Sequence, residues 1–396
     1  MNTRKLTYEI LKKIIIDKQY ANLLMRQYKK DEIKPIVTQV VYGVLRNWDL
    51  LSLQWSTYAT KTKMRTRILF NMAAYEFYFL NEEKYAVVNE TVGLAQKEEK
   101  SFVNAVLRRM VEQEMVYSED DAINYSIPKW IMNLWKAHYG EETAKQIAKQ
   151  SIETPVVYYQ LNTLVSSKQQ MEKIGAKFIN DTSFTFYDSL IQSDLMKQGC
   201  FQIQDFGASL IVEHLALNSG LKVLDLCAAP GGKTAQIAMK MKDDGEIIAC
   251  DLHPHRVALI EEKMKTLHIN SVCAKVMDGT CLNDAWLEHF DRILLDVPCS
   301  GLGVLSRRPD IKFHTSAENI DEIIQIQAQL LKTSVHYLKK EGIMVYSTCT
   351  LNKKENEKQI QQFLLQHPEM KLLHEETIWP HESLSDGFYL AKMIKQ

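Results

Sequence analysis

The spacing of hydrophobic residues divides the chain into a helical front and an alternating back. In the first 115 residues, apolar side chains recur at three- and four-residue intervals, beginning with Leu6, Ile10 and Ile14. This spacing is typical of amphipathic helices. Pro35 is the single proline of this stretch, and it marks a helix boundary. The pattern predicts an all-α domain, which we place at residues 1–125.

The pattern changes after residue 125. Pro128 and Pro155 interrupt the helical spacing, and β-branched and aromatic residues then gather at 156–161 and again at 184–187. Short runs of this composition predict strands. We interpret residues 126–205 as a small α/β linker domain that carries no chemical motif of its own.

From residue 206 onward, short apolar runs alternate with helical patterns. The runs lie at 222–227, 246–250, 272–276, 292–295 and 343–346. Such alternation predicts a parallel, doubly wound, Rossmann-like sheet with helices on both faces, here over residues 206–396. Sheets of this kind bind ligands at the carboxyl ends of their strands. The residues that follow each strand are therefore the candidates for a site.

Composition limits the class of protein. Hydrophobic residues make up 46% and charged residues 24% of the 396 positions, which is ordinary for a globular chain. No uncharged apolar run approaches the ~18 residues that a membrane span needs, and a helical pattern at the start speaks against a signal peptide. None of the seven cysteines belongs to a CxxC pair, which argues against a zinc ribbon and for a reducing compartment. We expect a cytoplasmic protein with neither a metal nor a membrane partner.

The net charge of −1 hides an asymmetry along the chain. The first 115 residues hold 19 lysines and arginines against 13 acidic residues, whereas the remainder holds 29 against 36. A basic front end predicts contact with phosphates. The cations Arg307, Arg308 and Lys312 are a second candidate for phosphate contact.

A glycine-rich turn follows the first strand of the predicted sheet, at residues 226–234. Such a turn before a helix lets backbone N–H groups approach a ligand closely. A P-loop would need glycine where Cys227 stands, and the GxGxxG fingerprint is also absent. The turn therefore predicts a ligand other than an ATP phosphate or a dinucleotide pyrophosphate. Its candidate binding residues are Cys227, Ala228, Ala229, Pro230, Gly231, Gly232 and Lys233.

Acidic residues stand at the ends of three consecutive strands. Asp225 lies at the first, Asp251 directly follows the second and Asp278 follows the third. An acid after the second strand can bind the hydroxyls of a ribose, and Asp278 could accept a bond from an adenine amino group. Alone, each is better explained by an exposed turn or a helix cap. Together they favour S-adenosylmethionine, which has a ribose, an adenine and a sulfonium but no phosphate.

Two cysteines follow the fourth and fifth strands, where they are expected at the same edge of the sheet. The fourth strand leads into Asp296-Val-Pro-Cys299, and the fifth leads into a Ser-Thr-Cys-Thr run that contains Cys349. We interpret four other cysteines as small buried hydrophobic residues: Cys200, Cys250, Cys273 and Cys281.

A cytosine C5 methyl transfer would need such cysteines. C5 of cytosine is a poor nucleophile until a thiolate adds to C6 and converts the ring into an enamine-like adduct. A base must then remove the C5 proton before the thiolate leaves, and an acid near N3 stabilises the adduct. Asp296 is placed for that last role. The target base must also leave any helical stack to reach the site.

These motifs resemble the RNA cytosine-5 methyltransferases of the NOL1/NOP2/Sun family. The resemblance is carried by residues 223–234, Asp251, Asp278, the Pro-Cys motif and the Thr-Cys motif. It implies a class I fold that binds S-adenosylmethionine, with Asp296 among the cofactor-binding residues. It also implies that Cys349 of the Thr-Cys motif is the nucleophile and that Cys299 assists product release, whereas DNA enzymes use the Pro-Cys cysteine as nucleophile.

The front of the chain resembles a NusB-type RNA-binding domain, most clearly at 40–48, 85–90 and 102–109. This narrows the resemblance to the branch of the family that acts on bacterial 16S rRNA. It implies a monomeric enzyme that methylates C5 of a cytosine in naked or early-assembly 16S rRNA, with cytosine 967 as the family expectation. Two alternatives stay open: a methyltransferase for tRNA or another rRNA site, and a NusB-like RNA-binding factor without catalysis.

Overall fold

The computed structural model describes residues 3–28, 33–191 and 193–396, and its chain forms two compact units. Unit 1 comprises Met1–Thr154 together with Val304–Thr315, and unit 2 comprises Pro155–Gly303 together with Ser316–Gln396. The division into three domains at residues 125 and 205 stays a prediction. No helix within the described ranges is long and apolar enough to cross a membrane.

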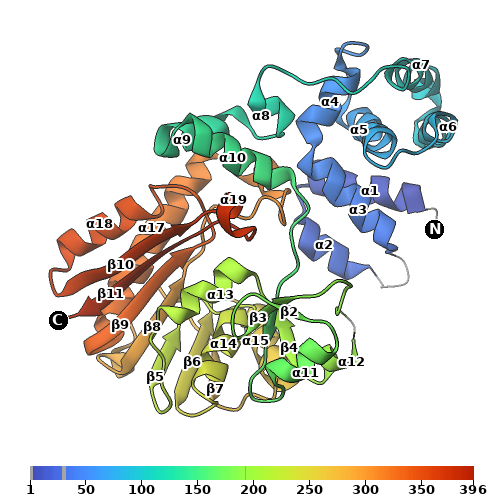
Figure 1. The fold of residues 1–396 in the computed structure, drawn as a ribbon. Helices are drawn as coiled ribbons and strands as arrows, with labels where there is room; N and C mark the ends of the chain where they lie inside the picture. The colour runs from blue at the N-terminus through green and yellow to red at the C-terminus, as the bar shows by residue number, and fades with distance from the viewer. Residues whose placement is uncertain (1–2, 29–32, 192) are drawn as a thin grey trace. The chain divides into compact units, whose positions relative to one another are not determined.

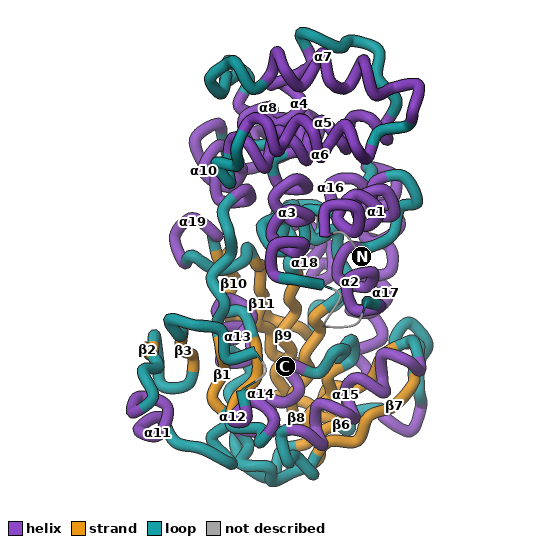
Figure 2. Tube along the Cα trace, turned by 90° about the vertical axis from the view of Figure 1, so that its right-hand side faces the viewer, coloured by secondary structure: helices purple, strands orange, loops and turns teal. Residues whose placement is uncertain are grey.

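Helices and no strands are found among the described elements of unit 1, and those within residues 1–125 agree with the predicted all-α domain (Figures 1 and 2). Its core gathers the apolar residues that repeat at helical spacing, including Leu6, Ile10 and Ile14. Its elements are α1 (Thr3–Ile15), α2 (Ala21–Gln27), α3 (Pro35–Arg46), α4 (Trp48–Ser56), α5 (Met64–Tyr78), α6 (Lys84–Leu94), η1 (Lys97–Glu99), α7 (Lys100–Met110), α8 (Asp121–Asn124), α9 (Lys129–Tyr139), α10 (Glu141–Ile152) and α16 (Ile311–His314). Helices α9 and α10, which fall in the predicted α/β linker, also belong to this unit.

The segment Val304–Thr315 is part of unit 1 although it follows a strand of unit 2 in the chain. Nζ of Lys312 donates to the backbone carbonyls of Arg46 (2.9 Å) and Ser126 (2.7 Å), and Nε of Arg46 donates to the carbonyl of Ser306 (2.7 Å). Burial lowers the pKa of Lys312 to about 7. Lys312 therefore fixes this segment within unit 1, and the prediction that it contacts phosphate is wrong.

Unit 2 contains a small antiparallel sheet and a large mixed sheet. The small sheet has the order β2-β3-β1-β4, and the large one has the order β10-β11-β9-β8-β5-β6-β7. The strands are β1 (Tyr159–Leu161), β2 (Lys177–Phe178), β3 (Ser183–Thr185), β4 (Phe201–Ile203), β5 (Lys222–Asp225), β6 (Glu246–Asp251), β7 (Val272–Val276), β8 (Phe290–Asp296), β9 (Leu338–Thr348), β10 (Met370–Ile378) and β11 (Phe388–Lys395).

The predicted parallel sheet is confirmed for β5 to β9, which pair in parallel. The sequence did not predict β10 and β11, which extend the sheet beyond β9 in antiparallel orientation. The parallel strands end together at one edge of the sheet, because parallel neighbours share one direction. That edge carries the candidate site.

Helices cover both faces of the large sheet. Val223 of β5 faces one core and Leu224 faces the other, because successive side chains of a strand point to opposite faces. Helices α13, α14 and α15 pack on the first face and α17 and α18 on the second (Figure 1). The helices and single turns of unit 2 are α11 (Lys168–Lys173), α12 (Asp194–Lys197), α13 (Phe206–Glu213), α14 (Gly232–Lys240), α15 (Pro254–Thr266), η2 (Asp284–Trp286), α17 (Ala317–Tyr337), α18 (Glu357–Gln366) and α19 (Pro380–Ser383).

The prediction that four cysteines are buried is only half right. Cys200 and Cys250 are buried, whereas Cys273 and Cys281 are exposed. Cys273 lies in β7, which forms an edge of the sheet, and Cys281 lies in the loop that follows it. An edge strand keeps a water-facing side, so apolar character alone did not predict burial here.

Candidate active site

The turn between β5 and α14 is held by its own backbone. The amide of Ala228 donates to the carbonyl of Cys250 (2.8 Å), and the amide of Gly231 donates to the carbonyl of Ala228 (2.7 Å). Gly231 has a φ of +92°, a left-handed conformation that favours glycine, and α14 begins at the next residue. A Cβ at Gly232 would meet nothing nearer than Oε1 of Gln202 at 3.9 Å. The start of α14 therefore leaves room for a ligand beside its backbone.

The small sheet supports this turn. Nε2 of Gln202, on β4, donates to the carbonyl of Gly232 (2.8 Å) and to Oε1 of Gln204 (2.8 Å). Nε2 of Gln204 in turn donates to Oε1 of Gln236 in α14 (2.6 Å). All three glutamines are buried. A chain of buried amides thus connects the small sheet to the turn and to the helix that follows it.

Asp225 is a buried carboxylate at the end of β5, with 1% of its surface exposed. Its Oδ2 accepts a bond from Oγ1 of Thr234 (2.7 Å), whereas its Oδ1 has no hydrogen-bond partner within the described chain. Burial raises the pKa of Asp225 to about 7. A buried acceptor without a partner calls for an explanation, and a bound ligand would supply one.

Asp251 ends β6 and is also buried. Its Oδ1 accepts a weak bond from the amide of His253 (3.3 Å), and its Oδ2 lies 3.3 Å from Nη1 of Arg256. Nη2 of Arg256 donates to the carbonyl of Ala229 in the turn (3.2 Å). Arg256 therefore connects the acid of the second strand to the turn after the first. Sequence reasoning missed this arginine, whose only signal was its place in the first turn of the helix after β6.

Asp278 follows β7 by two positions and is exposed. Its Oδ1 accepts bonds from the amide (2.9 Å) and from Oγ1 (2.6 Å) of Thr280. These hydrogen bonds lower the pKa of Asp278. The residue is thus an ionised turn-forming acid on the same edge of the sheet as Asp251, and the turn fixes where its carboxylate lies.

Lys233 and Asp296 form an ion pair across the site. Nζ of Lys233, in the first turn of α14, lies 2.7 Å from Oδ2 of Asp296 at the end of β8. The other oxygen of Asp296 accepts a bond from Oγ of Ser347 on β9 (2.8 Å). Burial alone would lower the pKa of Lys233, but the Asp296 carboxylate more than offsets burial and raises the pKa. Lys233 is therefore held charged at neutral pH.

The two cysteines of the Pro-Cys and Thr-Cys motifs meet. Sγ of Cys299 lies 3.3 Å from Sγ of Cys349, although 50 positions separate them in the chain. Cys349 follows β9 directly, because that strand runs on to Thr348. The hydrogen bond with the Cys349 thiol, together with burial, raises the pKa of Cys299 well above its ordinary value. Cys299 is thus held as a thiol beside Cys349.

Cys227 in the glycine-rich turn differs from this pair. Burial raises the pKa of its thiol well above the ordinary value, and the residue packs against the core beside α17. It therefore remains a protonated, weakly polar side chain at neutral pH, with a packing role in the turn.

A buried glutamate joins the two cysteine-bearing loops. Oε2 of Glu355 accepts from the amide of Ser300 (2.9 Å) and from Nε2 of Gln327 (3.2 Å). Its Oε1 accepts from Oγ of Ser300 (2.5 Å) and from Nδ2 of Asn352 (2.9 Å). The hydroxyl of Ser300 also contacts that of Thr350 (2.7 Å). Since Ser300 follows Cys299 and Thr350 follows Cys349, this network fixes both thiols at once.

Backbone contacts close the same arrangement. The amide of Gly303 donates to the carbonyl of Cys349 (3.1 Å), and a Cβ at Gly303 would lie 2.1 Å from the carbonyl oxygen of Gly387. Only glycine allows this approach. Asn356 adds a bond from its Nδ2 to the carbonyl of Thr350 (2.9 Å). Sequence reasoning missed Glu355 and Asn356, whose only signal was a polar run directly after the Thr-Cys motif.

The arrangement combines the groups that covalent transfer to a pyrimidine needs. Paired thiols supply a nucleophile and a neighbouring proton donor. The ion pair of Lys233 and Asp296 supplies fixed charges, and the turn after β5, with Asp225, Asp251 and Asp278, supplies acceptors for a ligand without phosphate. The predicted site residues thus lie along one edge of the large sheet.

Comparison with families of known proteins matches both halves of the chain. Residues 212–394 match the family described as 16S rRNA methyltransferase RsmB/F, and residues 1–112 match the NusB family. A protein of Bacillus subtilis (strain 168), "Probable ribosomal RNA small subunit methyltransferase B", is 30% identical over 443 residues. That comparison covers 100% of this chain and 99% of the relative.

Solved structures share the fold. The crystal structure of a protein named PH0851 has a TM-score of 0.82 at 21% identity and covers 99% of this chain and 98% of its own. The structure of "NSun6 from Pyrococcus horikoshii with SFG" has a TM-score of 0.62 at 23% identity and covers 68% of this chain and 98% of its own. Both support the fold of the site described above.

Proposed function

Because this chain belongs to the RsmB family of 16S rRNA methyltransferases, we propose that it methylates C5 of a cytosine in 16S rRNA, with S-adenosylmethionine as donor. The observation that carries this proposal is the pair of thiols 3.3 Å apart beside the ion pair of Lys233 and Asp296. We propose cytosine 967 as the target, on the family resemblance alone.

The residues around the turn after β5 fit the methyl donor. Asp251 would bind the ribose hydroxyls and Asp278 the adenine amino group, with the turn residues 227–233 around the rest of the ligand. The unpartnered Oδ1 of Asp225 and the open space at Gly232 support a ligand in this place. S-adenosylmethionine, when bound, supplies an electrophilic methyl group.

Cys349 acts as the nucleophile. Its thiolate forms a bond to C6 of the cytosine, and the electron pair of the C5–C6 double bond makes C5 nucleophilic. C5 then takes the methyl group as the bond between that methyl group and the donor's sulfonium sulfur breaks, and the electron pair of the broken bond stays on that sulfur. Removal of the C5 proton to a base then restores the double bond and breaks the bond between sulfur and C6. Cys299 is the nearest thiol to the departing sulfur, at 3.3 Å. We assign Cys299 to product release, in which its S–H stabilises the departing thiolate.

Asp296 holds the cytosine ring. Its carboxylate faces the N3 side, where it stabilises the proton that the covalent adduct carries. Lys233 and Ser347 each bind one of its oxygens, so the carboxylate cannot turn away from this orientation. Lys233 therefore positions Asp296 as well as lining the donor site.

The basic N-terminal part of the chain binds the RNA first. We assign RNA binding to the NusB-like residues 1–125, a linking role to residues 126–205 and catalysis to residues 206–396. We further propose naked or early-assembly 16S rRNA as the substrate, the cytoplasm as the location and a monomer as the active form. A non-catalytic RNA-binding factor would have no need for both cysteines or for the network around Glu355.

Methyl transfer to unmodified RNA tests this proposal. The full chain is incubated with labelled S-adenosylmethionine and with transcripts of 16S rRNA or of tRNA, and the nucleosides are analysed by mass spectrometry. The expected product is 5-methylcytidine in 16S rRNA, with none from the Cys349→Ala variant. Label in tRNA alone would contradict the proposed substrate, and full activity of Cys349→Ala would contradict the proposed nucleophile.

A further inference from the structure

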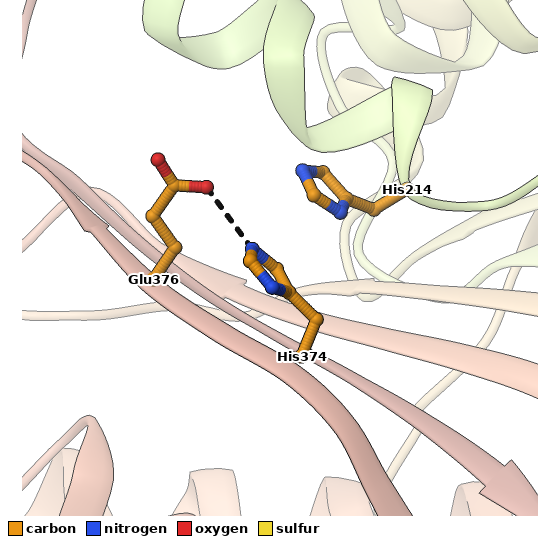
Figure 3. A group of neighbouring side chains, drawn as sticks. All are labelled: His214, His374 and Glu376. Atoms are coloured by element: carbon orange, nitrogen blue, oxygen red, sulfur yellow. Dashed lines mark hydrogen bonds and ion pairs between the residues drawn. The ribbon is translucent and has the colours of Figure 1, made fainter.

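Two histidines and a glutamate gather on the large sheet, outside the site described above (Figure 3). One ligand atom from each of His214, His374 and Glu376 lies within 4.8 Å of the other two. Nε2 of His374 is 3.1 Å from Oε2 of Glu376. The rings of His214 and His374 lie face to face, with centroids 4.9 Å apart and planes only 8° from parallel.

The fold brings these side chains together from two elements. His374 and Glu376 are two positions apart on β10, so both point to the same face of the strand. His214 is the residue at which α13 ends, and α13 packs on that face of the sheet. About 160 positions separate His214 from His374 in the chain. From the sequence we expected no metal, because the cysteines form no CxxC pair. That expectation did not consider histidines and a glutamate that lie far apart in the chain.

The chemistry of the three donors suits a divalent transition metal. Two imidazoles and one carboxylate form a donor set that Zn²⁺ takes in proteins, with a fourth position left for water. Donors around Zn²⁺ lie about 2.0–2.2 Å from the metal. Side-chain rotations suffice to close the cluster, because His374 and Glu376 are exposed.

The charges around the cluster are mixed. Lys392 stands opposite His374 in the register of β10 and β11, and it also lowers the pKa of His214. Glu213 precedes His214 and forms an ion pair with Lys240 (2.6 Å). Glu376 contributes the carboxylate of the cluster and bonds to His374.

We propose that His214, His374 and Glu376 form a binding site for one Zn²⁺ ion, which ties the end of α13 to the edge strand β10. The bound ion would crosslink two elements of unit 2 that are about 160 positions apart in the chain. A ligand that binds only the folded state stabilises it in proportion to the logarithm of its concentration above Kd. The bound ion therefore raises the temperature at which unit 2 unfolds.

Metal titration of the full chain tests this proposal. Zn²⁺ binding is followed by calorimetry and Co²⁺ binding by visible absorption, in wild type and in His374→Gln, His214→Gln and Glu376→Gln. Loss of a hydrogen bond that supports a metal ligand lowers the metal affinity about 10–100-fold. Loss of a ligand itself should lower the affinity by more than this. We expect one equivalent in wild type, none in the histidine variants, and a thermal shift on adding Zn²⁺ that those variants lack.

Two controls make the result specific. His289→Gln removes a histidine that also lies near a glutamate, since its Nε2 is 3.6 Å from Oε2 of Glu246. The same Nε2 is 3.4 Å from Nζ of Lys222. This variant should bind Zn²⁺ as wild type does. The thiols of Cys299 and Cys349 are the competing ligands, and a Co²⁺ complex with them shows a thiolate charge-transfer band. Unchanged binding in His374→Gln overturns the proposal, as does binding that carries this band and disappears in Cys299→Ser. Should the histidine variants misfold, the surface variant Glu376→Gln decides: undiminished affinity there also overturns it.

Discussion

Replacement of Glu355 by glutamine should separate the positioning of the two thiols from the binding of the methyl donor. The carboxylate accepts four hydrogen bonds from Ser300, Gln327 and Asn352, and its exposed fraction is 0%. Glutamine has the same shape but only one acceptor oxygen, so its amide nitrogen must face two of the donors. Hydrogen bonds to charged groups contribute about 1.5–3 kcal/mol each, and part of the loss is recovered when the Ser300 hydroxyl turns toward Thr350. We expect the free energy of unfolding to fall by about 3 kcal/mol.

The effect on activity should be larger than the effect on donor binding. Ser300 and Thr350 directly follow Cys299 and Cys349, so a rearranged network moves both sulfurs. Misplacement by about 1 Å costs on the order of 10²-fold in rate. The rate of methyl transfer at saturating S-adenosylmethionine should therefore fall about 10²-fold, whereas the Kd for the donor stays within about threefold because no residue of the turn belongs to the network.

Gln359→Leu is the matched control for this experiment. Its buried amide donates from α18 to the carbonyl of Ile324 in α17 (3.0 Å), so its loss removes a buried bond near Glu355 without touching either cysteine loop. Stability, transfer rate and donor affinity are measured for both variants at a temperature where each is folded. A Glu355→Gln variant that loses stability but keeps the wild-type rate would refute the positioning role.

Three further outcomes follow from the site. Because burial raises the pKa of Asp225 from 3.8 in the unfolded chain to about 7, the folded state binds the extra proton between these values, and stability falls by up to about 4 kcal/mol as the pH rises through this range. The free energy of unfolding of Asp225→Asn, measured by denaturant titration, should therefore exceed that of wild type by more at pH 8 than at pH 5. The same difference at both pH values would contradict this. Diamide should take two electrons and two protons from Cys299 and Cys349 and link them, with activity lost and then restored by dithiothreitol; peptide mapping that finds these thiols unlinked in the inactivated protein would speak against their contact. Asp251→Asn should weaken the Kd for S-adenosylmethionine about tenfold or more, since a hydrogen bond to a charged group is worth about 1.5–3 kcal/mol, and unchanged affinity in equilibrium dialysis would remove Asp251 from the donor site.

Strands buried on both faces were predictable from the sequence. Strands β5, β6 and β8 and the second half of β9 contain short apolar runs, because helices cover both faces of the sheet there. The edge strand β7 was predicted from its apolar residues although most of its residues are exposed. In contrast, β10 lies at an edge and most of its residues from Lys371 to Glu376 face water, so its sequence lacks a continuous apolar run. The sequence pattern also could not show that Val304–Thr315 packs within unit 1, because that depends on contacts with residues far away in the chain.

The candidate site was predictable where a residue stands at the end of a strand. Asp251, Asp278, Asp296 and the two cysteines were identified in this way, since strand ends of a parallel sheet converge on one edge. Glu355 and Arg256 were not, because their importance lies in hydrogen bonds to distant residues rather than in their position after a strand. Glu355, for example, bonds to Ser300, 55 positions earlier in the chain.

A covalent adduct between protein and RNA is the most direct test of the proposed chemistry. The Cys299→Ala variant is mixed with unmodified 16S rRNA and S-adenosylmethionine, and the mixture is run on a denaturing gel beside the Cys299→Ala/Cys349→Ala double variant. With Cys299 absent and release slowed, we expect an RNA-linked band in the single variant and none in the double variant. An adduct that persists without Cys349, or no adduct from a folded Cys299→Ala protein that binds the donor, would contradict the assignment of Cys349 as the nucleophile that attacks C6 of an rRNA cytosine.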